Sequence, residues 1–164
     1  ILNGRERFWA HRTHDHFQTD DSFSVGVIVS TYNNPNWLEK VLWGLSCQNH
    51  PAQEIIIADD GSTDDTRSLI QQYKSVLPLR HIWHEDCGFR KTTILNKAVE
   101  AAQSDYLIFI DQDLIPRRDF VQQHYLHAKA NRFISGGAIL LPEDLSNRIT
   151  IFIKNTVKTF SFGP

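Results

Sequence analysis

Several residue types that define common protein classes are scarce in this sequence of 164 residues. There is no methionine, and the two cysteines, Cys47 and Cys87, lie far apart and form no C-x-x-C pattern. Isolated cysteines of this kind are expected to be buried thiols rather than metal ligands or parts of a disulfide framework. The missing methionine predicts that the sequence is a piece of a longer protein.

Charge of one sign and long apolar runs are limited as well. Lys and Arg number 17 against 19 Asp and Glu, so no basic excess indicates nucleic-acid binding. The clearest apolar run, Tyr106–Ile110, is far shorter than the ~20 residues that a membrane-spanning helix needs. Residues 1–23 contain no apolar core of a secretory signal. Peripheral contact with a membrane surface stays compatible with this composition.

Several well-known site motifs are also absent. No G-x-x-x-x-G-K-[ST] or G-x-G-x-x-G pattern occurs, which disfavours P-loop ATPases and dinucleotide enzymes, and there is no G-x-S-x-G. Two histidine pairs, His81 with His84 and His124 with His127, have the spacing of one helix face. No third zinc ligand is evident beside them, and the second pair is expected to be a partly exposed helix face.

From residue 25 onward, short apolar runs alternate with segments of helical periodicity. The runs are rich in β-branched residues and bounded by turn residues, which is typical of strands. The predicted strands are Val25–Val29, Glu54–Ala58, Leu79–Trp83, Tyr106–Ile110 and Phe133–Leu141. This alternation predicts one α/β domain over residues 23–164, with a Rossmann-like, mainly parallel sheet flanked by helices. Residues 1–22 are polar without a steady period and are predicted to form an arm outside it.

The helical segments carry start signals. Asn34 is expected to cap the first helix, with Pro35 at its first position. Ser62 is expected to cap the second helix. A third helix is predicted through residues 94–102 and a fourth over Arg117–Ala130.

Polar clusters follow three of the predicted strands. Right-handed crossovers place the carboxyl ends of parallel strands along one edge of a sheet, where α/β proteins bind their ligands. The clusters are Ser30-Thr31-Tyr32-Asn33, Asp59-Asp60-Gly61-Ser62 and Asp111-Gln112-Asp113. We therefore expect them to meet in one ligand site.

Asp111 and Asp113 are separated by one residue and would point the same way on a continuing strand. Two adjacent carboxylates repel each other, and a hard divalent cation such as Mg²⁺ or Mn²⁺ would compensate their charge. That cation would also offset charge on a leaving diphosphate. The alternative is an exposed turn after a strand.

The other candidates also have two interpretations. Asp59-Asp60-Gly61-Ser62 is a good strand-to-helix turn, but a carboxylate there could also accept hydrogen bonds from a base or ribose. Tyr32 could stack on that base or serve in packing. Arg90 and Lys91 could neutralise phosphate or form a solvated helix start, and Asn96 follows them in the same helix.

Together these segments resemble family 2 glycosyltransferases of the GT-A fold. The matching stretches are VGVIVSTYN (Val25–Asn33), EIIIADDGST (Glu54–Thr63), HEDCGFRKTTILNKA (His84–Ala98) and DYLIFIDQD (Asp105–Asp113). The third stretch is similar to the subgroup that contains bacterial lipopolysaccharide-core and chondroitin-type sugar transferases. The resemblance covers about residues 24–142, which are the nucleotide-binding half of such a fold.

The resemblance implies roles for individual residues. Ser30, Tyr32 and Asp60 would hold a nucleoside, usually uridine, and Asp111 would contact the ribose or the sugar. Asp113 would be the catalytic metal ligand, with Asp111 as its neighbour in the metal site. The full set expected to bind the donor is Ser30, Thr31, Tyr32, Asn33, Asp60, Arg90, Lys91, Asn96, Asp111 and Gln112.

The sequence departs from the family pattern at two places. Leu95 stands where the family usually has Arg, which shifts the expected phosphate contact toward Arg90 and Lys91. An inverting transferase also needs a general base. In the family this base comes from a later Glu-Asp pair, and Glu143-Asp144 follows the last predicted strand too closely to match it.

The resemblance therefore implies a metal-dependent, inverting glycosyltransferase of hexosyltransferase type. It would move a sugar from a UDP-sugar or a related nucleotide-diphospho-sugar to a glycan or glycolipid in surface polysaccharide synthesis. The implied location is the cytoplasm, at the inner face of the membrane. Two alternatives stay open: a nucleotidyltransferase, which usually carries a Gly-rich loop after its first strand, and a non-catalytic nucleotide-binding fragment.

Overall fold

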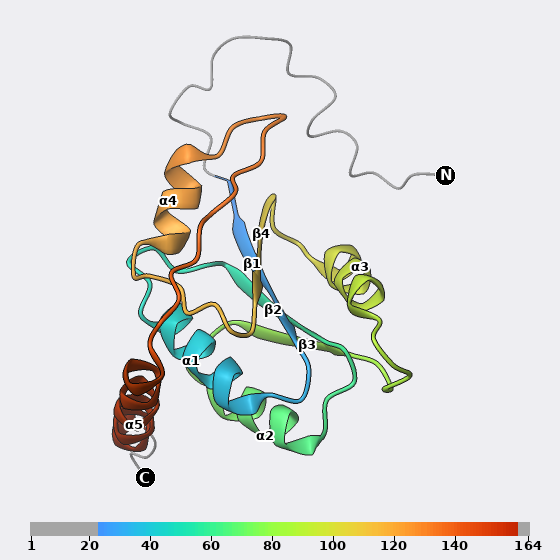
Figure 1. The fold of residues 1–164 in the computed structure, drawn as a ribbon. Helices are drawn as coiled ribbons and strands as arrows, with labels where there is room; N and C mark the ends of the chain where they lie inside the picture. The colour runs from blue at the N-terminus through green and yellow to red at the C-terminus, as the bar shows by residue number, and fades with distance from the viewer. Residues whose placement is uncertain (1–22, 161–164) are drawn as a thin grey trace.

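The computed structural model describes residues 23–160, so the predicted arm at residues 1–22 lies outside the described residues. Within this range the chain forms four strands and five helices (Figure 1). The strands are β1 (Val25–Thr31), β2 (Glu54–Asp59), β3 (Leu79–Trp83) and β4 (Tyr106–Asp111). The helices are α1 (Pro35–Ser46), α2 (Asp64–Tyr73), α3 (Lys91–Ala101), α4 (Phe120–His127) and α5 (Glu143–Phe160).

The four strands form one sheet in the order β3-β2-β1-β4, and every pairing is parallel. The sheet confirms the predicted α/β fold with parallel strands. The register pairs Thr31 with Asp59 and Ser30 with Asp111. Residues from three predicted polar clusters are therefore neighbours at the carboxyl edge of the sheet.

Helices cover both faces of the sheet, and the core is split accordingly. Val27 and Val29 of β1 pack in a cluster with residues of α1, α2 and α4. Ile28 points to the other face and packs with Ile94 and Ala98 of α3. All seven residues of β1 are buried, as expected for a strand covered on both faces. This burial fixes the position of the polar residues that follow it.

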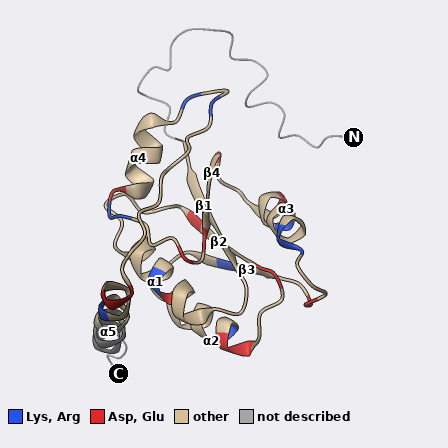
Figure 2. Cartoon of the chain, viewed as in Figure 1, with Lys and Arg blue, Asp and Glu red and all other residues tan. Residues whose placement is uncertain are grey.

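The first two helices begin differently from each other. Asn34 caps α1 by accepting a hydrogen bond from the Trp37 backbone at 3.4 Å, and Pro35 is the first helical residue, as predicted. The predicted cap of α2 by Ser62 is wrong, because Thr63 is the cap position and the Ser62 hydroxyl accepts from the Asn33 backbone instead. Acidic side chains occupy the first turn of α2 (Figure 2), where the helix dipole favours negative charge.

The helix predicted over Arg117–Ala130 is shorter than expected. It becomes α4 and ends at His127, because Ala128 adopts an extended backbone with ψ of 135°. Val121 is buried, and Phe120 and Tyr125 pack against the core, so this face of α4 points inward.

The predicted fifth strand at Phe133–Leu141 is wrong. This segment has no regular structure, and Phe133, Ile139 and Leu140 are each at least 88% exposed. A strand needs backbone partners on a neighbouring strand, and no described strand pairs with this segment. The apolar composition alone therefore does not produce a strand here.

Two further features were not expected from the sequence. Helix α5 follows the irregular segment and contacts α1 through a hydrogen bond from Lys40 Nζ to Ser146 Oγ at 3.2 Å. The cysteines are not buried thiols, because Cys47 is half-buried and Cys87 is exposed in a loop. Among the described helices, none combines the length and the apolar character that crossing a membrane requires.

Candidate functional site

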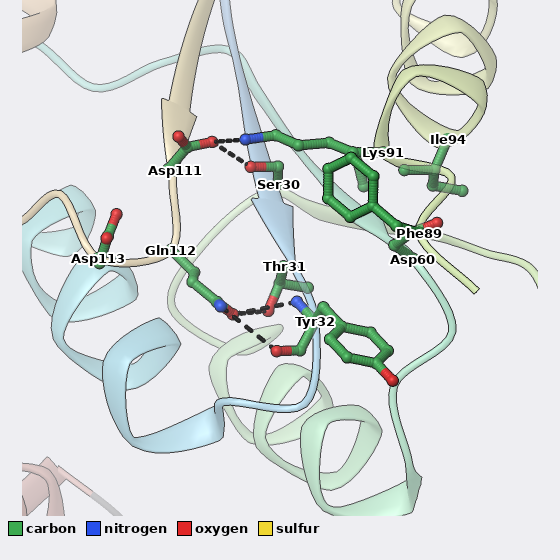
Figure 3. A pocket seen from close by; sticks show the side chains of 11 residues that line it. Ser30, Thr31, Tyr32, Asp60, Phe89, Lys91, Ile94, Asp111, Gln112 and Asp113 are labelled. Atoms are coloured by element: carbon green, nitrogen blue, oxygen red, sulfur yellow. Dashed lines mark hydrogen bonds and ion pairs between the residues drawn. The ribbon is translucent and has the colours of Figure 1, made fainter. Parts of the chain in front are cut away.

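An open pocket of about 240 Å³ lies at the carboxyl edge of the sheet (Figure 3). It is bounded by the ends of β1, β2 and β4 and by the start of α3. Its lining residues are Ser30, Thr31, Tyr32, Ala58, Asp60, Phe89, Lys91, Ile94, Asp111, Gln112 and Asp113. The three predicted polar clusters therefore contribute to one pocket, as the parallel topology requires.

Asp111 is the centre of a small charged cluster in this pocket. One of its oxygens, Oδ1, accepts hydrogen bonds from Ser30 Oγ and from Lys91 Nζ, both at 2.5 Å (Figure 3). Partial burial raises the pKa of Asp111, but the hydrogen bonds from Lys91 and Ser30 outweigh it and hold the pKa below its ordinary value. Lys91 thus supplies a positive charge that compensates this carboxylate.

Gln112 joins the ends of β4 and β1. Its Oε1 accepts from Thr31 Oγ1 at 2.6 Å and from the Tyr32 backbone N–H at 3.1 Å, and its Nε2 donates to the Tyr32 carbonyl at 3.3 Å. Gln112 therefore fixes the backbone that carries Tyr32. The Tyr32 hydroxyl donates to Asp86 at 2.9 Å, and this bond raises the pKa of Tyr32.

Asp113 lies in a turn beyond β4, so the alternation of a strand does not apply to it. β4 ends at Asp111, and the Leu114 N–H closes a turn on the Asp111 carbonyl at 3.1 Å. Figure 3 shows the Asp113 side chain apart from the contact between Asp111 and Lys91. The expectation that both carboxylates point the same way assumed a continuing strand, and the chain leaves the strand between them.

Asp60 is held at the back of the pocket and is buried. Its Oδ1 lies 2.6 Å from His84 Nε2, and its Oδ2 accepts from the Arg90 backbone N–H at 2.9 Å. The following Gly61 has a φ of +101°, and a Cβ there would lie 2.6 Å from the Cα of Asp86. Glycine is therefore required, both for the turn and for the close approach of the next loop.

Three residues of the predicted set lie outside the pocket lining. Asn33 takes part in loop structure, because its Oδ1 accepts from the Thr63 N–H at 2.9 Å. The guanidinium of Arg90 donates to the Glu85 carbonyl. Asn96 is exposed on α3. The structure does not bring these three side chains together with the others.

Other residues at the site were not expected from the sequence. Ala58, Phe89 and Ile94 line the pocket. Phe89 is 89% exposed, and an apolar residue within a polar loop was the available signal for it.

The histidine pairs also have partners that their spacing did not indicate. His81 lies 2.8 Å from Asp59, and His84 binds Asp60, so each of these histidines pairs with a separate carboxylate. His124 is half-buried and His127 is exposed on α4, which confirms a partly exposed helix face. The helix spacing was misleading for the first pair, because His81 is on a strand.

A metal at this site would need ligands from a second molecule. The described residues contain no group of three His, Cys, Asp or Glu side chains that could hold a metal. Asp111 and Asp113 offer two carboxylates in the pocket lining. Mg²⁺ and Mn²⁺ commonly bind one or two carboxylates plus phosphate oxygens, so the residues present fit a cation that arrives with a phosphate ligand.

Comparison with known proteins decides among the possible classes. Residues 26–158 match the family described as "Glycosyl transferase family 2". The chain belongs to this family. The resemblance inferred from the sequence motifs is confirmed. The family is one of glycosyltransferases.

Two relatives of the chain are named as a biosynthetic glycosyltransferase and as a synthase. A "Putative teichuronic acid biosynthesis glycosyltransferase TuaG" of Bacillus subtilis is 31% identical over 73% of this chain and 48% of that protein. A "Chondroitin synthase" of Escherichia coli is 27% identical over 61% of this chain and 15% of that protein. The chain spans less than half the length of these relatives.

Solved structures agree with the GT-A fold. Staphylococcus aureus TarS in complex with UDP-GlcNAc has a TM-score of 0.57 and 25% identity, over 63% of this chain and 30% of that one. The mannosyltransferase PcManGT from Pyrobaculum calidifontis, in complex with GDP-Man and Mn²⁺, has a TM-score of 0.51 and 29% identity over 61% and 32%. Both similar structures contain a nucleotide-sugar.

Proposed function

We propose that this chain binds a UDP-sugar together with Mg²⁺ or Mn²⁺, as the donor-binding part of an inverting hexosyltransferase. The acceptor would be a glycan or glycolipid in surface polysaccharide synthesis. The observation that carries the proposal is the meeting of Tyr32, Asp60, Asp111 and Asp113 in one pocket at the carboxyl edge of a parallel sheet. Family membership supports the reaction class.

Each part of the pocket suits one part of such a donor. Asp60 and Tyr32 lie at the end where a nucleoside would bind, through hydrogen bonds and stacking. Lys91 would neutralise the diphosphate. Asp111 and Asp113 would hold the cation, which when bound offsets charge on the departing diphosphate. Ser30 keeps Asp111 oriented through its 2.5 Å hydrogen bond.

A second candidate is donor binding without transfer. Inversion needs a base that removes the proton of the acceptor hydroxyl. The only carboxylates in the lining of the described pocket are Asp60, Asp111 and Asp113, and the proposal uses all three for the donor. This distribution leaves no lining carboxylate for the base, which favours donor binding without transfer by this chain. Assays of sugar transfer and of donor hydrolysis would separate the two candidates.

A calorimetric titration of UDP in the presence of Mn²⁺ tests the common part of both candidates. Asp113→Ala should weaken UDP binding by about tenfold, because a charged contact to the cation is lost. Asp65→Ala, on the exposed face of α2, is the matched control and should bind as the unchanged chain does. Absence of UDP binding, or equal binding by Asp113→Ala, would refute the proposal.

A further inference from the structure

Two aspartate–histidine pairs stand side by side where β2 and β3 end. Asp59 pairs with His81 at 2.8 Å, and Asp60 pairs with His84 at 2.6 Å. Asp59 also accepts a hydrogen bond from the Ser62 backbone at 2.8 Å and does not line the pocket. Asp60 does line it. The two pairs are alike in chemistry, but only the second faces the site.

The carboxylate of Asp60 is fixed at both oxygens by groups outside the pocket lining. His84 contacts Oδ1, and the Arg90 backbone N–H contacts Oδ2. The Asp60 and His84 side chains are only 8% and 7% exposed, so little water competes for these contacts. A carboxylate oxygen can accept more than one hydrogen bond, which leaves accepting capacity toward the pocket.

The surroundings of His84 define which nitrogen carries the proton. Its Nδ1 is buried and has no hydrogen-bond partner among the described residues. With the proton on Nε2, the ring donates to Asp60 and leaves only an acceptor lone pair unpaired. The other tautomer would bury an unpaired N–H and place two acceptors against each other at 2.6 Å. The geometry therefore makes His84 a donor to Asp60.

We propose that His84 is a positioning residue that holds Asp60 as a fixed acceptor and thereby selects the nucleobase. This inference rests on the proposed function, because it requires a nucleoside diphosphate in the pocket. A fixed carboxylate favours a base that presents an N–H, as uracil does at N3. Cytosine presents an unprotonated N3 at the same ring position, which would repel the carboxylate. His84 would thus contribute to discrimination between UDP and CDP without touching either.

The test compares UDP and CDP affinity in a matched pair of variants. His84→Met and His84→Gln introduce side chains of similar length, but only Gln keeps an N–H that can reach Asp60. With Mn²⁺ present, His84→Met should weaken UDP binding by about tenfold and CDP binding much less, so the ratio of the two affinities falls. His84→Gln should restore most of that ratio. Thermal unfolding of each variant monitors the fold.

His81→Met is the internal control, because it breaks the neighbouring pair that does not line the pocket. It should lower the melting temperature and leave the ratio of UDP to CDP affinity unchanged. If His84→Met does not fold, His84→Asn takes its place, since its shorter amide does not reach Asp60.

The possible results separate the inference from the function it rests on. A UDP-to-CDP ratio that is unchanged in His84→Met overturns the role of His84 while UDP binding itself stands. A ratio that falls equally in His84→Gln and in His81→Met overturns it too, because the effect would then come from general loosening of the loop. If the unchanged chain binds no nucleoside diphosphate, the proposed function fails first.

Discussion

The two walls of the pocket are built differently. On the β2 side, Asp60 is buried, and both of its oxygens already accept hydrogen bonds from within the protein. On the β4 side, the Asp111 side chain is 51% exposed, and Asp113 forms no hydrogen bond or ion pair with the described residues. On the β2 side, groups of the protein already bind both oxygens of the carboxylate. On the β4 side, the carboxylates are free to accept further hydrogen bonds and to bind a positive charge.

This difference separates recognition from chemistry. A wall whose groups are fixed in advance gives selectivity, because a wrong ligand cannot rearrange it cheaply. A wall whose carboxylate and lysine are partly exposed can instead exchange partners with the proposed diphosphate and cation. We therefore expect substitutions on the β2 side to affect stability and selectivity, and those on the β4 side to affect the affinity for phosphate and metal.

The largest expected effect comes from breaking the fixed wall at Gly61. Gly61→Ala combines a φ of +101° with a Cβ 2.6 Å from the Asp86 backbone, so it should destabilise the fold by about 3 kcal/mol. Chemical denaturation measures this change. Gly88→Ala is the control, since its φ of +85° is similar but a Cβ there would meet nothing within 4 Å. Equal losses in the two variants would show that the close approach at Gly61 has no energetic weight.

A smaller and pH-dependent effect is expected at Asp59. Burial raises the pKa of Asp59, but the hydrogen bonds from His81 and Ser62 outweigh it and hold the pKa below its ordinary value. Such a group stabilises the fold above the pKa of the unfolded chain, and this contribution is lost as the pH falls through the folded pKa.

Asp59→Asn should therefore cost about 2 kcal/mol near neutral pH and progressively less in acid. Unfolding free energies measured at several pH values for both chains would reveal the convergence. A cost that stays constant across the pH range would mean that the charge of Asp59 does not contribute.

The third effect tests whether the charged groups on the β4 side exchange partners. Lys91 forms an ion pair with Asp111, and the proposed diphosphate would compete for Lys91. Lys91→Met should weaken UDP binding by about tenfold because a charged phosphate contact is lost. The same substitution should strengthen the binding of Mn²⁺ alone, because it removes a competing cation from Asp111.

Titrations of UDP and of Mn²⁺, each alone, measure these two opposite changes. Lys97→Met, further along α3 and exposed, controls for the loss of one positive charge. If Lys91→Met changed both affinities in the same direction, Lys91 would not be exchanging partners between protein and ligand.

The sequence predicted the fold well where the pattern was strongly constrained. β1 is buried on both faces, and its residues Val25–Val29 form an apolar run interrupted only by Gly26; β3 has the predicted bounds. The meeting of Ser30, Asp60 and Asp111 follows from parallel topology alone. At Phe133–Leu141 the same kind of pattern failed, because composition does not reveal whether a neighbouring strand is present.

The details of the site were less predictable because they depend on turns. The direction of Asp113 is decided by where β4 ends, and the spacing of Asp111 and Asp113 carries no information on that point. Arg90 was expected at the phosphate, but its guanidinium binds a carbonyl of its own loop. The role of His84 depends on a contact across 24 residues of sequence, which only the packing of β3 beside β2 produces.

Gln112 has a consequence for how the two ends of the pocket respond to each other. Its side chain forms two hydrogen bonds with the backbone of Tyr32, which follows β1. Its own backbone lies between Asp111 and Asp113. A shift of either carboxylate would therefore act on the backbone that carries the Tyr32 ring. We therefore expect Gln112 to couple the proposed cation site to the proposed nucleoside site.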